Sequence, residues 1–136
     1  MTDAVDEREA LPPVATMPAG GAVRVCPLRR LTPDRGAAAL VGDHQVAVFR
    51  LSVPRAGASL FAIGNRDPFS GAHVLSRGIV GDAGGVPKVA SPVYKQAFDL
   101  RTGTCLDDPS VRVPTYPVAV DDEGWVVVGP AVSADP

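Results

Sequence analysis

Two histidines and two cysteines are the side chains of this sequence best suited to acid–base, nucleophilic or metal chemistry. They are His44, His73, Cys26 and Cys105, and no Gly-x-Ser-x-Gly motif accompanies them. His44 falls in an expected hairpin turn and His73 in a loop, so we interpret both as structural or solvated side chains and not as bases. The sequence therefore predicts no catalytic residue on this chain.

A metal site built from these four side chains would require four distant segments to converge. Sites of the Cys2His2 type usually contain a close pair such as Cys-x-x-Cys or His-x-x-x-His, and this sequence has neither. The chain also shows no export signal, because Met1–Pro13 is acidic where a signal peptide is basic and then apolar. We therefore expect no metal site, a cytoplasmic location, and two reduced thiols in or near the core.

Nucleic acids, membranes and nucleotide phosphates are poor candidates for partners. The net charge is −2 and the pI is about 5.6, so no overall positive potential attracts polyanions. No apolar run approaches the roughly 20 residues of a membrane helix. Gly81–Gly85 lacks the Lys-Ser/Thr ending of a phosphate-binding loop, and a plain glycine turn explains it.

The composition indicates a single all-β domain between two tails. The chain has 136 residues, of which 46% are hydrophobic and 21% charged, the balance of one globular domain. Its 14 glycines and 14 prolines oppose long helices and favour short strands joined by turns. Residues 1–21 are acidic and contain several prolines, so we expect a mobile tail there, the folded domain at 22–129, and a second tail at 130–136.

Short apolar segments between turn residues predict a series of antiparallel strands. Ser59–Ile63 is apolar at successive positions, so it is expected to be buried on both faces. Residues 65–86 contain several Gly and Pro turns and are expected to form a long structured loop region. Small sheets in a sandwich or barrel are the expected architecture. The other expected strands are Ala22–Cys26, Ala37–Val41 and Gln45–Leu51 in a hairpin around Gly42–His44, Lys88–Ser91 and Tyr94–Leu100 broken at Pro92, Thr104–Leu106 after a turn at Arg101–Gly103, and Pro117–Val120 paired with Trp125–Val128.

Two loop sequences resemble the cluster-binding loops of Rieske iron–sulfur domains. The first is Gly64–Ala72 (GNRDPFSGA), and the second is Ser91–Tyr94 (SPVY), which is followed by Phe98–Gly103 (FDLRTG). In that family the first loop carries Cys-x-His and Gly-Ala, and the second carries Cys-Pro-x-His and leads into a Phe-Asp hairpin. The resemblance implies a Rieske-like fold in which both loops lie at one tip.

The four ligand positions of that family hold other residues in this chain. Asp67 and Phe69 stand at the first Cys and His, and Ser91 and Tyr94 stand at the second pair. Clusters of this type are held by thiolates and imidazoles, which these side chains cannot replace. The resemblance therefore implies a Rieske-like fold without a cluster, and no cofactor on this chain.

The wider sequence is similar to the small subunits of assimilatory NAD(P)H-dependent nitrite reductases, the NirD family. The similarity implies an accessory subunit beside a large subunit, which carries FAD, an iron–sulfur cluster and siroheme and reduces nitrite to ammonium. It extends from about Val25 to Val128. It depends on five strings, Ala62–Asn65, Asp67–Ala72, Val74–Asp82, Ala90–Gln96 and Phe98–Gly103.

A tip without a cluster leaves its residues available for a protein contact. Phe69 either packs inward or contacts a partner, whereas Tyr94 is able to bury its ring and keep its hydroxyl in water. The alternative is that both aromatic rings only fill the volume of the absent cluster, and that Arg77 and Lys95 are ordinary solvated charges. The candidate partner-binding residues are Asp67, Pro68, Phe69, Ser70, Arg77, Tyr94 and Lys95.

Two other functions compete with the accessory subunit. A stand-alone binding or regulatory module without a redox role would keep the fold and bind a different partner. A Rieske-type [2Fe-2S] electron carrier is opposed by the residues at the four ligand positions. The residues themselves thus argue against the carrier, while only the family resemblance argues against the stand-alone module.

Overall fold

The computed structural model describes residues 22–55 and 57–132, and most of the regular structure there is β-strand. The expected all-β class is confirmed. The elements are β1 (Val23–Pro27), η1 (Leu28–Arg30), β2 (Arg35–Val41), β3 (His44–Arg55), β4 (Ala58–Gly64), η2 (Leu75–Arg77), β5 (Ile79–Ala83), β6 (Val86–Ala90), β7 (Ala97–Asp99), β8 (Thr115–Tyr116), β9 (Val118–Val120) and β10 (Trp125–Val128), where η marks a short 3₁₀ helix.

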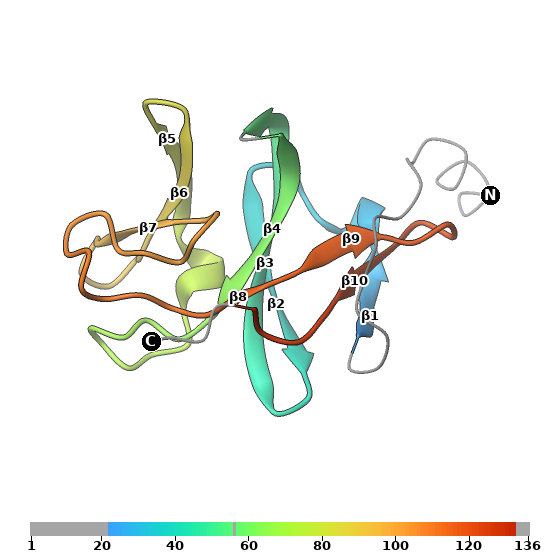
Figure 1. Cartoon of the computed structure of the whole chain (residues 1–136), viewed down its shortest axis with the longest axis horizontal. Helices are drawn as coiled ribbons and strands as arrows, with labels where there is room; N and C mark the ends of the chain where they lie inside the picture. The colour runs from blue at the N-terminus through green and yellow to red at the C-terminus, as the bar shows by residue number, and fades with distance from the viewer. Residues whose placement is uncertain (1–21, 56, 133–136) are drawn as a thin grey trace.

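These strands form three small antiparallel sheets. The central sheet has the order β2-β3-β4-β8, and the other two have the orders β5-β6-β7 and β1-β10-β9. Figure 1 shows the central sheet between the other two. The first and last strands pair directly, with Val23 opposite Val128, so the two ends of the described chain meet in one sheet.

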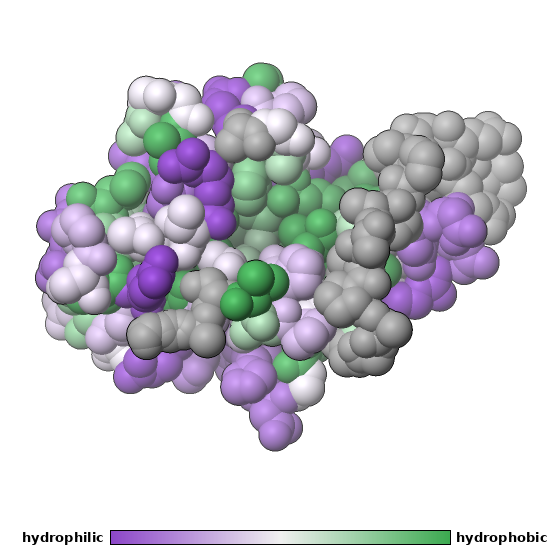
Figure 2. Space-filling view, viewed as in Figure 1, coloured by the Kyte–Doolittle hydropathy of each residue, from purple (hydrophilic) through white to green (hydrophobic). Residues whose placement is uncertain are grey.

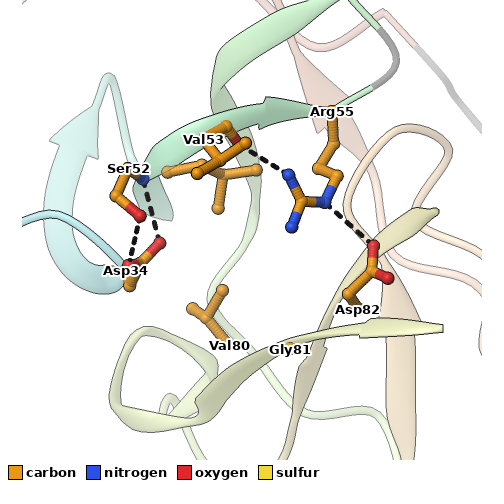
Figure 3. Close-up of a pocket in the computed structure, with 8 residues that line it drawn as sticks. Asp34, Ser52, Val53, Arg55, Val80, Gly81 and Asp82 are labelled. Atoms are coloured by element: carbon orange, nitrogen blue, oxygen red, sulfur yellow. Dashed lines mark hydrogen bonds and ion pairs between the residues drawn. The ribbon is translucent and has the colours of Figure 1, made fainter.

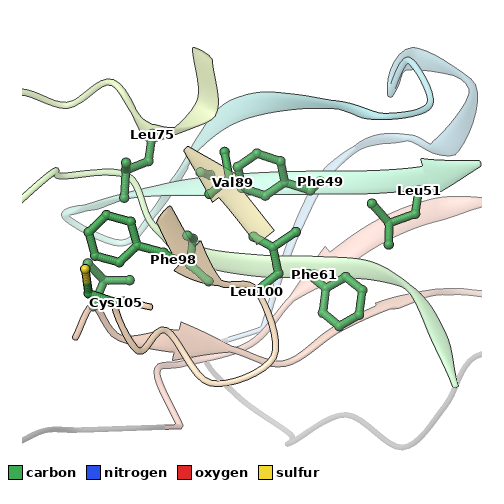
Figure 4. Packing of buried hydrophobic residues seen from close by; sticks show 11 residues of the cluster. Phe49, Leu51, Phe61, Leu75, Val89, Phe98, Leu100 and Cys105 are labelled. Atoms are coloured by element: carbon green, nitrogen blue, oxygen red, sulfur yellow. The ribbon is translucent and has the colours of Figure 1, made fainter. Parts of the chain in front are cut away.

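Strand β4 of the central sheet contributes to cores on both faces of the sheet, as expected for Ser59–Ile63. Phe61 and Ile63 point into one core, and Leu60 and Ala62 point into the other, because successive side chains of a strand alternate between faces. The first core, part of which is shown in Figure 4, lies toward β6, β7 and η2 and includes Phe49, Leu75, Val89, Phe98 and Leu100. The second core lies toward β1 and β10 and includes Val46, Val48, Val126 and Val128.

The first and the last of the expected hairpins are present, with shifted boundaries. The expected strand Thr104–Leu106 is not formed, because this segment makes only isolated bridges, Phe98 with Cys105 and Thr104 with Arg112. The hairpin of β2 and β3 turns at Gly42–Asp43, so His44 is the first residue of β3 and not part of the turn. The hairpin of β9 and β10 is also confirmed. Tyr94 was expected in a strand, but β7 begins only at Ala97, because residues 91–96 form a tight loop after Pro92.

The expectation of a continuous loop over 65–86 is wrong in its second half. That half contains η2 and the strand β5, which pairs with β6 in a hairpin. Gly84 and Gly85 both have positive φ and form its two-residue turn. The interpretation of Gly81–Gly85 as a glycine turn is therefore confirmed for these two residues, whereas Gly81–Ala83 belong to β5. Gly81 weakened the strand signal, and pairing with β6 compensates for its low β-propensity.

Cys26 and Cys105 are both free, and Cys105 is fully buried in the first core while Cys26 is half-buried beside the second. Residues 1–21 and 133–136, where the tails were expected, lie outside the described residues. No helix among the described residues is long and apolar enough to cross a membrane.

The face of the molecule seen in Figure 2 has a hollow at its middle, and hydrophobic side chains line this hollow. A groove of about 470 Å³ lies between β4 and β9, with Leu60 and Val118 in its walls.

Candidate functional site

The two loops that resemble cluster-binding loops have the same backbone conformation. In the first, the Asp67 carboxylate accepts a hydrogen bond from Phe69 N at 2.8 Å, and Gly71 N donates to Asp67 O at 2.7 Å. In the second, Ser91 Oγ accepts from Val93 N at 3.2 Å, and Lys95 N donates to Ser91 O at 3.0 Å. Asp67 and Ser91 therefore each stabilise the turn that follows them through side chain and carbonyl together.

The residue four positions after Asp67 and the residue four positions after Ser91 both have a positive φ, +80° for Gly71 and +70° for Lys95. Glycine adopts this conformation without cost, whereas lysine loses about 1–2 kcal/mol in it. The second loop therefore holds Lys95 in a strained backbone conformation at the tip, with its side chain exposed.

A buried hydrogen bond joins the two loops. Ser91 Oγ donates to Asp67 Oδ2 at 2.6 Å, and both residues have no exposed surface. Burial alone would raise the pKa of Asp67, but the hydrogen bonds from Ser91, Phe69 and Ser70 outweigh it and hold that pKa below its usual value. The two side chains that stand at the family's cysteine positions thus contact each other directly. Their hydrogen bond holds the two loops together at the tip.

The other candidate residues of the tip differ in their exposure. Phe69 is half-buried, packs on the first core and lies 6.2 Å from the ring of Phe98, so much of it faces inward. Tyr94 points outward with 59% of its surface exposed. Pro68 and Ser70 are half-buried, and Ser70 Oγ accepts from Ala72 N within the first loop.

Arg77 ends η2 and is exposed close to the second loop. A Cβ on the next residue, Gly78, would lie 2.3 Å from the carbonyl oxygen of Ala90, which directly precedes Ser91. This close backbone approach brings the end of η2 against the start of the second loop.

One exposed hydrophobic residue at the tip was not singled out from the sequence. Val93 is 43% exposed beside Tyr94, so the second loop presents two apolar side chains to solvent. Val93 lies between Pro92 and Tyr94 in the expected second loop, and this position could have indicated an exposed apolar side chain.

The four residues considered for metal chemistry, Cys26, His44, His73 and Cys105, do not form one group. In residues 22–55 and 57–132, no three side chains among His, Cys, Asp and Glu form a group that could hold a metal ion. His44 and His73 are both exposed.

A pocket of about 260 Å³ separates the end of β3 from β5, as Figure 3 shows. Its polar side chains satisfy one another: Asp34 accepts from Ser52 N and Oγ at 2.9 and 2.7 Å, and Arg55 Nε donates to Asp82 at 3.0 Å. We interpret this pocket as a structural connection between the two sheets, because these groups already have partners.

Comparisons with known proteins agree with this geometry. The family model of the Rieske-like [2Fe-2S] domain matches residues 22–129. The small subunit of nitrite reductase (NADH) from Escherichia coli K12 is 42% identical over 98 residues, which are 72% of this chain and 88% of that protein. A crystal structure from Mycobacterium tuberculosis, assigned as an NADH-dependent nitrite reductase small subunit, has a TM-score of 0.73 at 50% identity and covers 84% of this chain and 96% of that chain.

A third similarity is to a much longer protein. The large subunit of nitrite reductase [NAD(P)H] from Klebsiella oxytoca is 42% identical over 105 residues, which are 77% of this chain but only 10% of that subunit. A domain like this one is therefore part of a large-subunit polypeptide in that organism.

Proposed function

Because this chain belongs to the Rieske-like domain family and, within it, to the NirD family of nitrite reductase small subunits, we propose that it is the cofactor-free accessory subunit of an NAD(P)H-dependent nitrite reductase. In this role it associates with a large subunit that carries FAD, an iron–sulfur cluster and siroheme and reduces nitrite to ammonium for assimilation. The chain acts through association, and the chemistry takes place on the partner.

The match to the Klebsiella oxytoca large subunit is the observation that carries the proposal. Since similar domains occur as a separate small subunit and inside a large subunit, we infer that the domain contacts the rest of the large subunit in both arrangements. Covalent connection raises the effective concentration of a contact but does not create one. A contact surface for the large subunit is therefore expected on this chain.

We place that surface at the tip formed by the two loops. Tyr94, Lys95 and Arg77 are exposed there, and Tyr and Arg are enriched in the centres of protein interfaces. Pro68, Phe69 and Ser70 form the half-buried side of the tip. The buried Asp67 contributes indirectly, because its hydrogen bond to Ser91 holds the two loops together.

The first test is nitrite reduction by the isolated large subunit, with and without this chain. Oxidation of NAD(P)H and formation of ammonium are followed together. We expect the added chain to bind and to raise turnover. Equal turnover without any binding would contradict the proposal and would leave the stand-alone binding module as the better interpretation.

Reversing two exposed charges of the tip, those of Arg77 and Lys95, should weaken this association. For Arg77→Glu combined with Lys95→Glu, we expect an increase of at least about tenfold in Kd, which corresponds to about 1.4 kcal/mol. The readout is binding to the immobilised large subunit at constant ionic strength. The matched control is Arg30→Glu, an exposed arginine on η1 after β1, which should bind as the wild type does. Unchanged binding by the double variant would exclude the tip.

The purified chain should also lack an iron–sulfur cluster. Asp67 and Ser91 are hydrogen-bonded to each other, and neither provides the thiolate that a cluster requires. We expect no visible absorption and no stoichiometric iron after anaerobic purification. A coloured protein with two irons per chain would instead support the electron carrier.

A further inference from the structure

A second polar pocket, of about 290 Å³, lies beside the first loop. It is formed by the β2–β3 turn, the first loop and the segment that leads into β8. Two arginines and two histidines line it, together with one carboxylate and one tyrosine. These residues are Arg66, Arg112, His44, His73, Asp43 and Tyr116.

The cationic side chains of this pocket have no partner within the described part of the chain. The backbones of Arg66 and Arg112 form isolated bridges to His73 and Thr104, but neither guanidinium forms a hydrogen bond or ion pair with another described residue. By contrast, Arg24, Arg55 and Arg101 each bind a carboxylate at 2.8 to 3.0 Å. The lining thus contains two guanidinium groups but a single carboxylate, that of Asp43.

The pocket also has a fixed floor. Asn65 is 1% exposed, and its side chain donates to Gln45 Oε1 and to the carbonyl of His73 while it accepts from Ser76 N at 2.7 Å. A Cβ at Gly71 would lie 3.6 Å from Nη2 of Arg66, so this guanidinium lies over the first loop. The backbone beneath Arg66 is thus fixed by the hydrogen bonds of Asn65.

A further hydrogen-bond donor of the lining, the hydroxyl of Tyr116, is unpaired among the described residues. Tyr116 is 7% exposed, and no hydrogen bond between described residues uses its hydroxyl. Burial raises the pKa of Tyr116, which keeps the hydroxyl protonated and able to donate.

We propose that this pocket binds a planar oxyanion with two oxygens on one atom, a carboxylate or nitrite. The guanidinium fork pairs with two such oxygens at once, and Pro68, Val113 and Pro114 add apolar surface to the lining beside it. The anion is either free in solution or the side chain of an acidic residue of the large subunit. The second source depends on the proposed function, and the first does not.

The test is a titration of the ¹⁵N-labelled full chain with sodium nitrite and with sodium acetate, followed by NMR. Sodium chloride at the same ionic strength is the reference. We expect saturable shifts of the amides of Asn65, Arg66, His73 and Arg112 with both oxyanions and not with chloride. Arg66→Gln combined with Arg112→Gln should reduce the affinity at least tenfold. The control is Arg30→Gln combined with Arg35→Gln, two exposed arginines outside this lining, and it should bind the anions normally.

Binding to the large subunit then distinguishes the two sources. If the Arg66 and Arg112 double variant loses the anion shifts but binds the large subunit normally, the site takes a free oxyanion. If it also binds the large subunit at least tenfold more weakly, and acetate competes with that binding, the site takes an acidic side chain. Shifts that do not saturate, that equal those with chloride, or that persist in the double variant would overturn the proposal. Binding of the wild-type chain to the large subunit tests the proposed function separately.

Discussion

Replacing Gly103 with alanine is expected to remove much of the folding stability of this chain. Gly103 has a φ of +78°, and a Cβ there would lie 2.1 Å from the carbonyl oxygen of Val113. Its N–H donates to Asp99 O at 2.7 Å, and its carbonyl accepts from Val113 N at 2.9 Å, so neither segment can move away without losing a hydrogen bond. We expect a loss of about 3 kcal/mol or more, because a left-handed alanine costs about 1–2 kcal/mol and overpacking adds about 1–3 kcal/mol. The free energy of unfolding of the variant and of the wild type is measured by urea denaturation at pH 7.

Gly84→Ala is the matched control for this prediction. Gly84 has a similar φ of +61°, but a Cβ there meets nothing within 4 Å. Its replacement therefore includes the backbone cost without the close approach, and should destabilise by about 1–2 kcal/mol. Equal losses in the two variants would show that the contact with Val113 contributes nothing. If Gly103→Ala does not fold at 25 °C while Gly84→Ala does, the prediction is met in its strongest form.

Replacing Asp67 with alanine should have the second largest effect on stability. The carboxylate accepts hydrogen bonds from Ser91 Oγ and Phe69 N, and its removal leaves the Ser91 hydroxyl buried without that acceptor. Leaving buried donors without acceptors costs about 1–3 kcal/mol each, so we expect a loss of about 2–4 kcal/mol. The control is Asp108→Ala, which removes similar bonds to Ser110 in an exposed turn and should cost less than about 1 kcal/mol.

The contribution of Asp67 should also depend on pH. Its pKa in the folded chain lies below its usual value, because the hydrogen bonds to the carboxylate outweigh the effect of burial. The ionised form then stabilises the fold fully above the unfolded pKa of about 4, and this stabilisation is lost as the pH falls through the folded value. The difference in unfolding free energy between wild type and Asp67→Ala should therefore shrink from pH 7 to pH 3. A difference that stays constant over this range would contradict an ionised Asp67.

Much of the fold is predictable from local sequence. The hairpin at Gly42 and the β9–β10 hairpin follow from turn residues between apolar runs, and the double burial of Ser59–Ile63 follows from its apolar residues on both faces. Strand β5 was missed because Gly81 and neighbouring glycines obscure its pattern. Strand β8, with only two residues, was missed because it exists only where it pairs with β4.

At the tip, too, some features follow from the sequence and others do not. The four residues at the ligand positions could be read from the sequence, but the exposure of Tyr94 and the inward packing of Phe69 could not. Which side of a loop residue meets the core depends on the sheets beneath it, and local propensity does not contain that information.

By itself, the sequence determined the all-β class, the family, and which side chains replace the cluster ligands, because residue identities and their spacing are sufficient for these conclusions. Only the tertiary structure decided that Asp67 meets Ser91 in a buried hydrogen bond and that Arg66 and Arg112 share one pocket. These residues come from separate loops and segments, and the order of strands in the sheets brings them together. Such contacts depend on non-local strand pairing, whose free energy comes from the packed cores as a whole and not from any short stretch of sequence.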